Sequence, residues 1–248
     1  MKFNEDIFNL ALGNDVSWNT ILVVCLCSSG VDSIAATHYM NKKFGKVLSW
    51  RDIKFHFTTL HIDHNYREQN LQMLISYEDF CRIESVPKSI SQITHHASRK
   101  KFTEDYLRKA RHDILGTFFE HFSKTKIIFV TGHHLDDCVE NYMLNVIRGH
   151  PAYAPMPTIS KHQGDCYEYI MCKPFIFSRK QEMINYCADN DLLRYVCEDS
   201  TNSESKGSRR NMIRNEILPI LERDKVGLPT IVRKMMEKRL SLDIIREC

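Results

Sequence analysis

Four clusters of polar and small residues have the types and spacing to do chemistry, and the first is Ser28-Ser29-Gly30-Val31-Asp32-Ser33. Small residues let the backbone approach an anion closely, and the free N–H groups at a helix N-terminus point at that anion. No Gly-Lys-Ser/Thr follows, so the cluster is not a Walker P-loop. It predicts a nucleotide phosphate site, or else a strand-to-helix turn that needs only small residues.

The second cluster is His133-His134-Leu135-Asp136-Asp137-Cys138-Val139-Glu140. His133, Asp137 and Glu140 are spaced i, i+4, i+7, so a helix presents them on one face. Carboxylates gathered on a buried face are costly unless they meet a cation, a metal or an amine. The cluster therefore predicts a site for an amine or for a metal ion. The alternative is that His134 and Asp136 cap the helix and that the other side chains are solvated.

The other two clusters contain arginine or histidine. Glu104, Arg108 and Arg111 share the i, i+4, i+7 spacing, which alone is typical of a salt-bridged, solvent-exposed helix face. Residues 61–67 (His-Ile-Asp-His-Asn-Tyr-Arg) stand where a predicted strand ends. Ligands of open α/β sheets bind beyond the carboxyl ends of the strands, where the first, second and fourth clusters all lie. We therefore expect these three clusters to form one site.

The elements that must position these clusters alternate between short apolar runs and helix-period segments. Strands are predicted at 20–27, 54–63, 87–93, 126–131, 167–175 and 194–197. Helices are predicted at 32–44, 67–83, 102–122, from the two histidines to Gly149, and from Ser178, which has a capping-box spacing to Gln181. Residues 150–165 read as an irregular loop, 198–208 as a polar stretch, and the rest as two basic helices broken near 227–229. The alternation predicts an α/β fold, an open parallel sheet with helices on both faces, plus a short C-terminal helical extension.

The composition excludes several classes of protein. The chain has 248 residues, 43% of them hydrophobic, which excludes disorder, coiled coil and collagen. Its longest apolar run, 20–27, is shorter than the ~18–20 residues that span a bilayer. Glu5 and Asp6 precede any apolar stretch, so we expect no signal peptide and a cytoplasmic location or an equivalent reducing compartment. The nine cysteines include no C-x-x-C pair, which disfavours a zinc ribbon or a cysteine-ligated iron–sulfur cluster.

The small net charge of +3 hides an asymmetry along the chain. Residues 1–203 hold 23 basic and 24 acidic side chains, whereas residues 204–248 hold 11 basic and 7 acidic ones. We therefore divide the chain into a catalytic domain, 1–203, and a basic helical extension, 204–248. A basic end favours a polyanionic partner, although a solvated helical face has the same composition.

Several segments together resemble a known family. Ser28–Ser33 resembles the S-G-G-x-D-S loop of N-type ATP pyrophosphatases, the PP-loop superfamily of adenine nucleotide α-hydrolase-like folds. The order of motifs is similar to the tRNA(Ile)-lysidine synthetase family. The matching segments are 61–67, Glu104-x-x-x-Arg108-x-x-Arg111, 133–140 with Arg148-Gly149, 173–175, 198–202, and Arg210-Asn211-x-Ile213-Arg214 with Leu218-Pro219.

The sequence departs from the family pattern at a few positions. Ser29 replaces the first loop glycine, where its side chain either crowds the phosphate approach or adds a hydroxyl donor. Asn65 replaces a glycine, and Asn141 stands where a threonine follows the family glutamate. Many members continue into C-terminal tRNA-binding domains, whereas this sequence ends about 27 residues after the last matched motif. We therefore expect a minimal form that lacks full C-terminal domains.

The resemblance implies a two-step ligation that uses ATP and Mg²⁺. The C2 oxygen of the first anticodon cytidine in an isoleucine tRNA with a CAU anticodon attacks the α-phosphate of ATP, and the ε-amine of free lysine then displaces AMP. The expected catalytic residues are Asp32, Asp137, Glu140 and Arg111, and the expected ATP-binding residues are Ser28, Ser29, Gly30, Val31, Asp32, Ser33, His61, Asp63 and His133. The expected lysine and tRNA contacts are Arg108, Arg111, Asp137, Glu140, Arg210, Asn211 and Arg214, with Arg209, Lys234, Lys238 and Arg239 on tRNA phosphates.

The protein alone is expected to hold no metal, with Mg²⁺ carried by ATP and contacted by Asp32. Either Asp32 or Asp137 is expected to accept the proton that the lysine amine must lose. We expect a monomer or a homodimer and no membrane contact. Two alternatives stay open: a tRNA thiolase of the same superfamily, of the cytidine 2-thiolase type, and a tRNA- or nucleotide-binding homologue that has lost catalysis.

Overall fold

The fold is built on one sheet whose central strands run parallel. The computed structural model describes residues 1–13, 20–45, 48–50, 53–64, 68–93, 104–120, 125–150, 156–163, 168–197, 209–223 and 227–247. Within these residues the strands are β1 (Thr20–Leu26), β2 (Leu48–Trp50), β3 (Ile53–Asp63), β4 (Lys88–Gln92), β5 (Lys126–Val130), β6 (Ile159–Gln163) and β7 (Glu168–Cys172). They form a seven-stranded sheet in the order β2-β3-β1-β5-β7-β6, and β4 pairs with the end of β3. Only β2 and β6, at the two edges, pair antiparallel.

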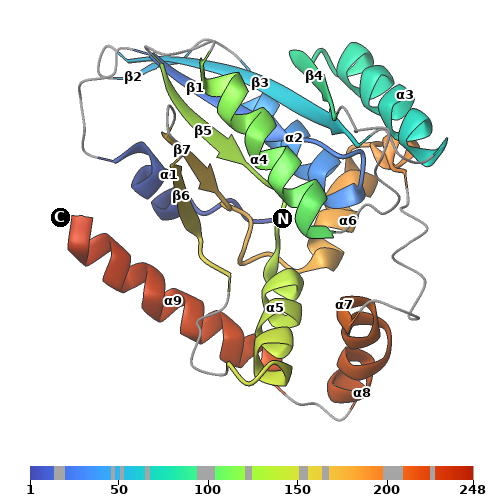
Figure 1. Ribbon diagram of the computed structural model, residues 1–248, viewed down its shortest axis with the longest axis vertical. Coiled ribbons are helices and arrows are strands. Elements are labelled where there is room, and N and C mark those ends of the chain that lie inside the picture. The colour runs from blue at the N-terminus through green and yellow to red at the C-terminus, as the bar shows by residue number, and fades with distance from the viewer. Residues whose placement is uncertain are drawn as a thin grey trace.

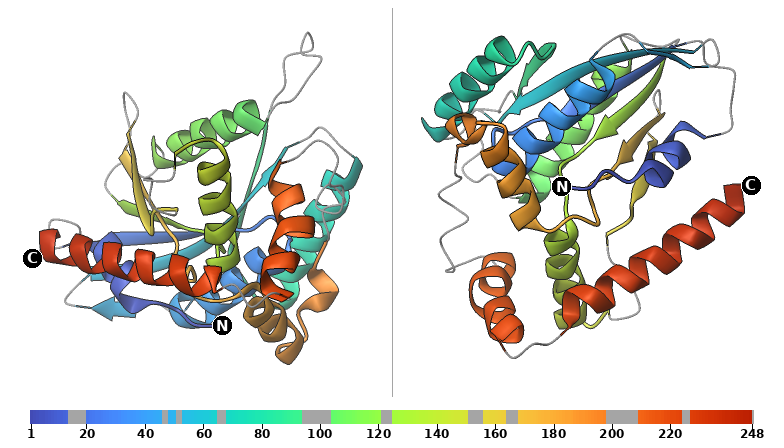
Figure 2. Two further views of the ribbon diagram at one scale, coloured as in Figure 1. Left: turned by 90° about the horizontal axis from the view of Figure 1, so that it is seen from below. Right: turned by 180° about the vertical axis from the view of Figure 1, so that it is seen from behind.

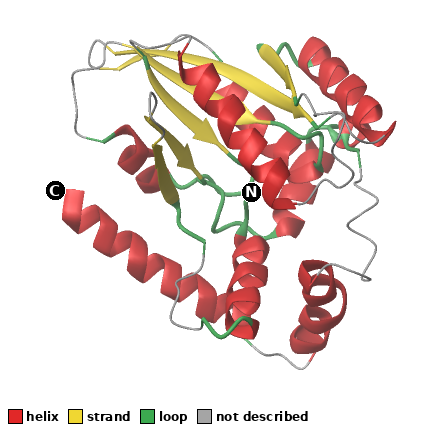
Figure 3. Ribbon diagram, in the orientation of Figure 1, coloured by secondary structure: helices red, strands yellow, loops and turns green. Residues whose placement is uncertain are grey.

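Helices cover both faces of this sheet (Figure 1). They are α1 (Glu5–Leu12), α2 (Val31–Phe44), α3 (Glu68–Ile83), α4 (Glu104–Glu120), α5 (Leu135–Ile147), α6 (Lys180–Asp189), α7 (Arg209–Met212), α8 (Leu218–Arg223) and α9 (Leu228–Glu247). A 3₁₀ turn, η1 (Leu193–Tyr195), follows α6, and a π-helical turn, η3 (Ile213–Ile217), joins α7 to α8. The expected α/β fold with helices on both faces of an open sheet is confirmed (Figure 3).

Residue alternation along the strands produces two cores. In β1, Ile21, Val23 and Cys25 belong to a large apolar cluster with α1, α2, α3, α5 and α6. Leu22 and Val24 point to the opposite face and join a smaller cluster that is closed by α4. A parallel strand buried on both faces reads as a continuous apolar run, which is why 20–27 carries no polar alternation.

The C-terminal helices pack against α5. The apolar side of α9 contributes Val232, Met236 and Leu240 to the large cluster, and α9 crosses the end of α5 (Figure 2). The Arg233 guanidinium also donates to the Phe177 carbonyl at 2.7 Å. Among the described helices, none is both long enough and apolar enough to cross a membrane.

Some of the expected elements are wrong or missing. Residues 194–197 form no strand, because Leu193–Tyr195 make a 3₁₀ turn. Helix α1 and the edge strands β2 and β6 were not expected, and β6 lies inside the segment expected to be an irregular loop. The expected capping box at Ser178 is also wrong. The Ser178 hydroxyl exchanges hydrogen bonds with the Lys2 backbone, and Glu182 accepts the Arg179 N–H at 2.7 Å to begin α6.

Candidate active site

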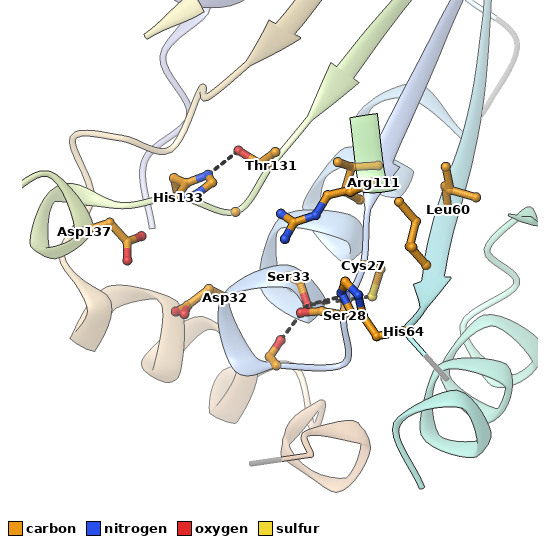
Figure 4. Close-up of a pocket in the computed structure, with 14 residues that line it drawn as sticks. Cys27, Ser28, Asp32, Ser33, Leu60, His64, Arg111, Thr131, His133 and Asp137 are labelled. Carbon is orange, nitrogen blue, oxygen red and sulfur yellow. Dashed lines mark hydrogen bonds between the residues drawn. The ribbon is translucent and has the colours of Figure 1, made fainter. Parts of the chain in front are cut away.

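A cavity of about 350 Å³ lies where β1, β3 and β5 end, and α2, α4 and α5 supply its other walls (Figure 4). All four clusters contribute to its lining, and the three that follow strands meet there as the topology of an open sheet requires. Its lining residues are Leu26, Cys27, Ser28, Gly30, Asp32, Ser33, Leu60, Ile62, His64, Arg111, Thr131, Gly132, His133 and Asp137.

The loop between β1 and α2 forms the polar floor of this cavity. The Ser33 hydroxyl accepts the Ser28 N–H at 3.1 Å and donates to the Gly30 carbonyl at 2.9 Å, which closes the loop on itself. Gly30 is the N-cap of α2, and no side chain caps that helix. The first N–H groups of α2 are therefore left to a ligand, which is the arrangement that binds phosphate.

The Ser29 side chain points away from the cavity. Its φ of +63° lies in the left-handed region, where glycine is favoured. The buried hydroxyl donates to the Met73 carbonyl of α3 at 2.7 Å, and the Ser29 carbonyl accepts the Cys197 N–H at 2.8 Å. The hydroxyl therefore points to α3 and not into the cavity, in contrast to both expectations for this position.

Gly132 lets the end of β5 lie directly against this loop. A Cβ atom at Gly132 would be 2.5 Å from the Asp32 carbonyl oxygen and 3.1 Å from the Ser33 nitrogen. Both neighbours are backbone atoms that cannot rotate aside. Only glycine therefore allows this contact between the first and second clusters.

His134 joins the two clusters electrostatically. It is the N-cap of α5: its backbone N–H donates to Asp137 Oδ2 at 3.0 Å, and its ring accepts the Asp137 N–H at 3.4 Å. The alternative in which His134 caps the helix is therefore confirmed for this residue. Burial opposes charge on His134, but Asp32, Asp137 and Asp136 outweigh it and raise the pKa of the imidazole.

The Asp32 carboxylate lines the cavity and forms an ion pair with His134. Its buried Oδ1 lies 3.5 Å from His134 Nε2. A carboxylate on the cavity wall fits a divalent cation carried by a nucleotide, since hard cations prefer oxygen ligands. No group of three or more His, Cys, Asp or Glu side chains within the described ranges is placed to hold a metal by itself.

His133 is a neutral imidazole on the cavity wall. Its Nδ1 is 2.6 Å from the Thr131 hydroxyl (Figure 4). Burial lowers the pKa of His133 to about 4, against the opposing effect of Asp137. The two histidines in turn hold the pKa of Asp137 below its ordinary value although burial raises it. At neutral pH the cavity therefore presents an uncharged ring beside an ionised carboxylate.

His61 and Asp63 are not among the residues that line the cavity, and their expected role in binding ATP stays a prediction. His61 donates to the Cys27 carbonyl at 2.8 Å and stacks on Tyr77, with 4.9 Å between ring centroids. Asp63 accepts hydrogen bonds from Asn70 and Gln92. These side chains hold the end of β3 in place, whereas His64, which had no assigned role, lines the cavity.

The two arginines of α4 separate. Arg111 projects into the cavity from above the loop (Figure 4), whereas Arg108 is exposed on the helix surface. The side chain of Glu104, residues 65–67 and the segment 198–202 lie outside the described residues. Arg111 is thus the member of that cluster that the structure brings to the site.

Glu140 is not part of the cavity lining, in contrast to its expected contact with a substrate. Its carboxylate is 2% exposed and receives two hydrogen bonds from Arg214, Nε to Oε1 at 2.6 Å and Nη2 to Oε2 at 2.8 Å. Arg210 Nε lies 3.5 Å from Oε2, and Arg214 Nη2 lies 3.9 Å from Asp137 Oδ1. Arg214 therefore lies much closer to Glu140 than to Asp137, the carboxylate that lines the cavity.

Residues 7–221 match a family described as the PP-loop domain. The chain belongs to the PP-loop family. It is 28% identical to the tRNA(Ile)-lysidine synthase of Thermotoga maritima over 203 residues. This aligned region covers 81% of this chain and 45% of that protein. It is 25% identical to the tRNA(Ile)-lysidine synthase of Rickettsia bellii over 249 residues. That aligned region covers 98% of this chain and 53% of the relative. This PP-loop chain therefore spans about half the length of these relatives.

A solved structure resembles the PP-loop chain across nearly its whole length. The U34-tRNA thiolase NcsA of Methanococcus maripaludis superposes with a TM-score of 0.65 at 15% identity, covering 96% of this chain and 79% of that one. At this identity the likeness shows a shared fold. The expected PP-loop superfamily and the expected fold are both confirmed by these comparisons.

Proposed function

We propose that this chain is an ATP-dependent ligase that modifies tRNA, of the tRNA(Ile)-lysidine synthase type. The observation that carries the proposal is one cavity that holds an uncapped helix N-terminus, the carboxylate of Asp32 and the ionised carboxylate of Asp137. These groups suit a triphosphate and an amine. The names of the relatives supply the reaction type.

In the first step, the loop and α2 would bind the phosphates of ATP through backbone N–H groups. Leu26, Leu60 and Ile62 form an apolar wall that suits the adenine ring. The C2 oxygen of the cytidine forms a bond to the α-phosphorus, and the bond to the bridging oxygen breaks, so pyrophosphate leaves with that electron pair. Asp32 would hold Mg²⁺, which neutralises phosphate charge when bound, and Arg111 would stabilise the same charge from the opposite wall.

In the second step, the lysine ε-amine attacks C2 of the adenylated base and AMP leaves. The amine has an ordinary pKa of about 10.4, so it arrives protonated and must lose a proton before it attacks. Asp137 stays ionised and lines the cavity, which suits it to bind the ammonium group and accept its proton. Neutral His133 adds no positive charge that would repel the ammonium group.

The test is lysine incorporation by the purified chain with ATP, Mg²⁺, radiolabelled lysine and a tRNA with a CAU anticodon. We expect label in the tRNA together with stoichiometric pyrophosphate and AMP. Asp32→Asn and Asp137→Asn should each reduce the rate by about a hundredfold or more. The control Asp113→Asn changes an exposed carboxylate on α4 and should leave the rate unchanged.

The same assay separates the alternatives. Tight tRNA binding without pyrophosphate release would instead identify a binding protein. A sulfur-containing product would identify a thiolase, for which the cavity offers Cys27. Burial raises the pKa of the Cys27 thiol, so this sulfur is a poor nucleophile, which favours the ligase.

A further inference from the structure

The ion pair between Glu140 and Arg214 joins α5 to the polypeptide beyond residue 208. It has the bidentate geometry of the strongest arginine–carboxylate contacts, with both bonds shorter than 3 Å. The carboxylate is 2% exposed and the guanidinium 25% exposed. Glu140 therefore has no open face toward the cavity.

An incoming ammonium group could reach Glu140 only by displacing Arg214. That exchange would leave a guanidinium without its buried partner, and an uncompensated buried charge is strongly unfavourable. Asp137, one turn earlier on α5, lines the cavity, and Arg214 approaches it less closely than it approaches Glu140. Its Oδ2 accepts the helix-capping N–H, while Oδ1 lies 3.9 Å from Arg214 and close to the cavity.

We propose that Glu140 and Arg214 form a latch that fixes residues 209–223 against α5, and that both are positioning residues which do not touch lysine. This inference rests on the proposed function. Of the two carboxylates, it assigns binding of the lysine amine to Asp137 and not to Glu140. Asn211 and Ile213, which lie just before Arg214 in the sequence, are both buried, so the backbone that carries the latch is itself packed against the protein. The π-helical turn that begins at Ile213 carries Arg214, and such turns are common at functional sites.

The consequence of the latch is the placement of Arg210. Its guanidinium lies near Glu140, and its charge acts on both His133 and Asp137. Its Nε is buried without a hydrogen-bond partner among the described residues. The latch therefore holds a cation of the C-terminal segment beside the second cluster, within electrostatic reach of two residues that line the cavity.

A double-mutant cycle tests the latch. Glu140→Gln, Arg214→Gln and the double variant are compared for kcat, for KM of lysine and tRNA, and for hydrogen exchange in residues 209–223. We expect both single variants to reduce kcat/KM for tRNA by about tenfold and to increase exchange in that segment, with the double variant no worse than either single one. KM for lysine should stay within about twofold of its original value.

Matched variants control for charge and folding. Asp79→Asn and Arg82→Gln break an exposed arginine–carboxylate pair on α3 and should change none of these quantities. Arg214→Lys keeps the charge but loses the bidentate geometry, so it should recover part of the tRNA affinity. If Arg214→Gln does not fold, Arg214→Lys carries the test.

Two outcomes would overturn the proposal. A rise of about tenfold in KM for lysine with Glu140→Gln, absent from Arg214→Gln, would show direct contact with the amine. A lower KM for lysine with Arg214→Gln would show that this arginine blocks the lysine site. Hydrogen exchange reports on the latch without catalysis. Increased exchange in both variants of a chain that forms no lysidine would therefore support the latch and refute the proposed function.

Discussion

Ser29 shows how a single residue can stabilise the loop between β1 and α2 through a contact on the side away from the cavity. The left-handed backbone costs a non-glycine residue ~1–2 kcal/mol, and the buried bond from its hydroxyl to the Met73 carbonyl returns about 1 kcal/mol. We predict that Ser29→Ala, which keeps the strain and loses the bond, lowers the free energy of unfolding by about 1 kcal/mol. Ser29→Gly loses both the backbone strain and the hydrogen bond, so its free energy of unfolding should stay within about 1 kcal/mol of that of the original chain.

Urea denaturation measures both variants. Ser241→Ala is the control, because its hydroxyl bonds to the Glu237 carbonyl on an exposed helix face and should matter little. Equal stability of Ser29→Ala and Ser29→Gly would contradict this account of the strain and the bond.

His133 makes the stability of the fold depend on pH. Its pKa is about 4 in the folded chain against an ordinary 6.5, so the unfolded chain binds a proton between these values that the folded chain does not. The free energy of unfolding therefore falls as the pH is lowered from 6.5 toward 4. We predict that His133→Gln removes on the order of 2 kcal/mol of that loss, allowing for the partial exposure of the ring.

The measurement is the unfolding free energy as a function of pH, taken as the difference between variant and original chain. His134 provides a control of opposite sign. Its pKa is raised, so its contribution is fully present below the ordinary pKa and is lost as the pH rises through the folded value. If His133→Gln and His134→Gln shifted the pH profile in the same direction, these assignments would fail.

The sequence predicts which residue types meet at the site better than it predicts which way each one points. Leu60 and Ile62 of β3 line the cavity, as does His64 just after the strand, whereas His61 and Asp63 point to the other side. Successive side chains of a strand point to opposite faces of the sheet. Knowing that one residue of β3 lines the cavity would therefore have been enough to assign its neighbours to one face or the other. For Glu140 no sequence signal exists, because its partner Arg214 is 74 residues away.

At the scale of elements, the contact between the end of β5 and the start of α2 brings the two clusters together. Gly132 permits this contact, since a Cβ there would meet the Asp32 carbonyl at 2.5 Å. We predict that Gly132→Ala weakens ATP binding by about tenfold or more, because the loop must move away to make room. Isothermal titration with ATP and Mg²⁺ measures the change.

Gly227→Ala is the matched control, because a Cβ at Gly227 meets nothing within 4 Å. It should leave ATP affinity unchanged. Unchanged affinity in Gly132→Ala would mean that the phosphates do not bind in this loop.

The elements that sequence periodicity missed are short or irregular. Strand β2 has 3 residues and β6 has 5, too few to establish a period of two. Residues 194–197 combine apolar and aromatic side chains like a strand, yet Ser76 donates to the Tyr195 carbonyl and holds this segment against α3. The local sequence of 194–197 is compatible with a strand, and tertiary contacts select the 3₁₀ turn instead.

At the scale of the whole molecule, the C-terminal helices are both part of the core and part of the charged surface. Val232, Met236 and Leu240 bury one side of α9, which leaves Lys234 and Lys238 exposed on the other. The exposed lysines of α9 are therefore held in place by the packing of its apolar side. A polyanion bound along this surface would gain affinity from released counterions.

We predict that tRNA binding by this chain weakens steeply between about 50 and 200 mM salt. The double variant Lys234→Gln/Lys238→Gln should lower affinity at low salt and reduce the slope of log K against log salt by about 1 to 2, because each phosphate contact contributes about 0.7 to 0.9. Lys54→Gln is the control, since Lys54 is exposed at the start of β3, at the opposite end of that strand from the cavity. Filter binding at several salt concentrations measures all three proteins. An unchanged slope in the double variant would remove α9 from the tRNA-binding surface. It would favour the cavity, which Arg111 lines, as the place where the anticodon is held.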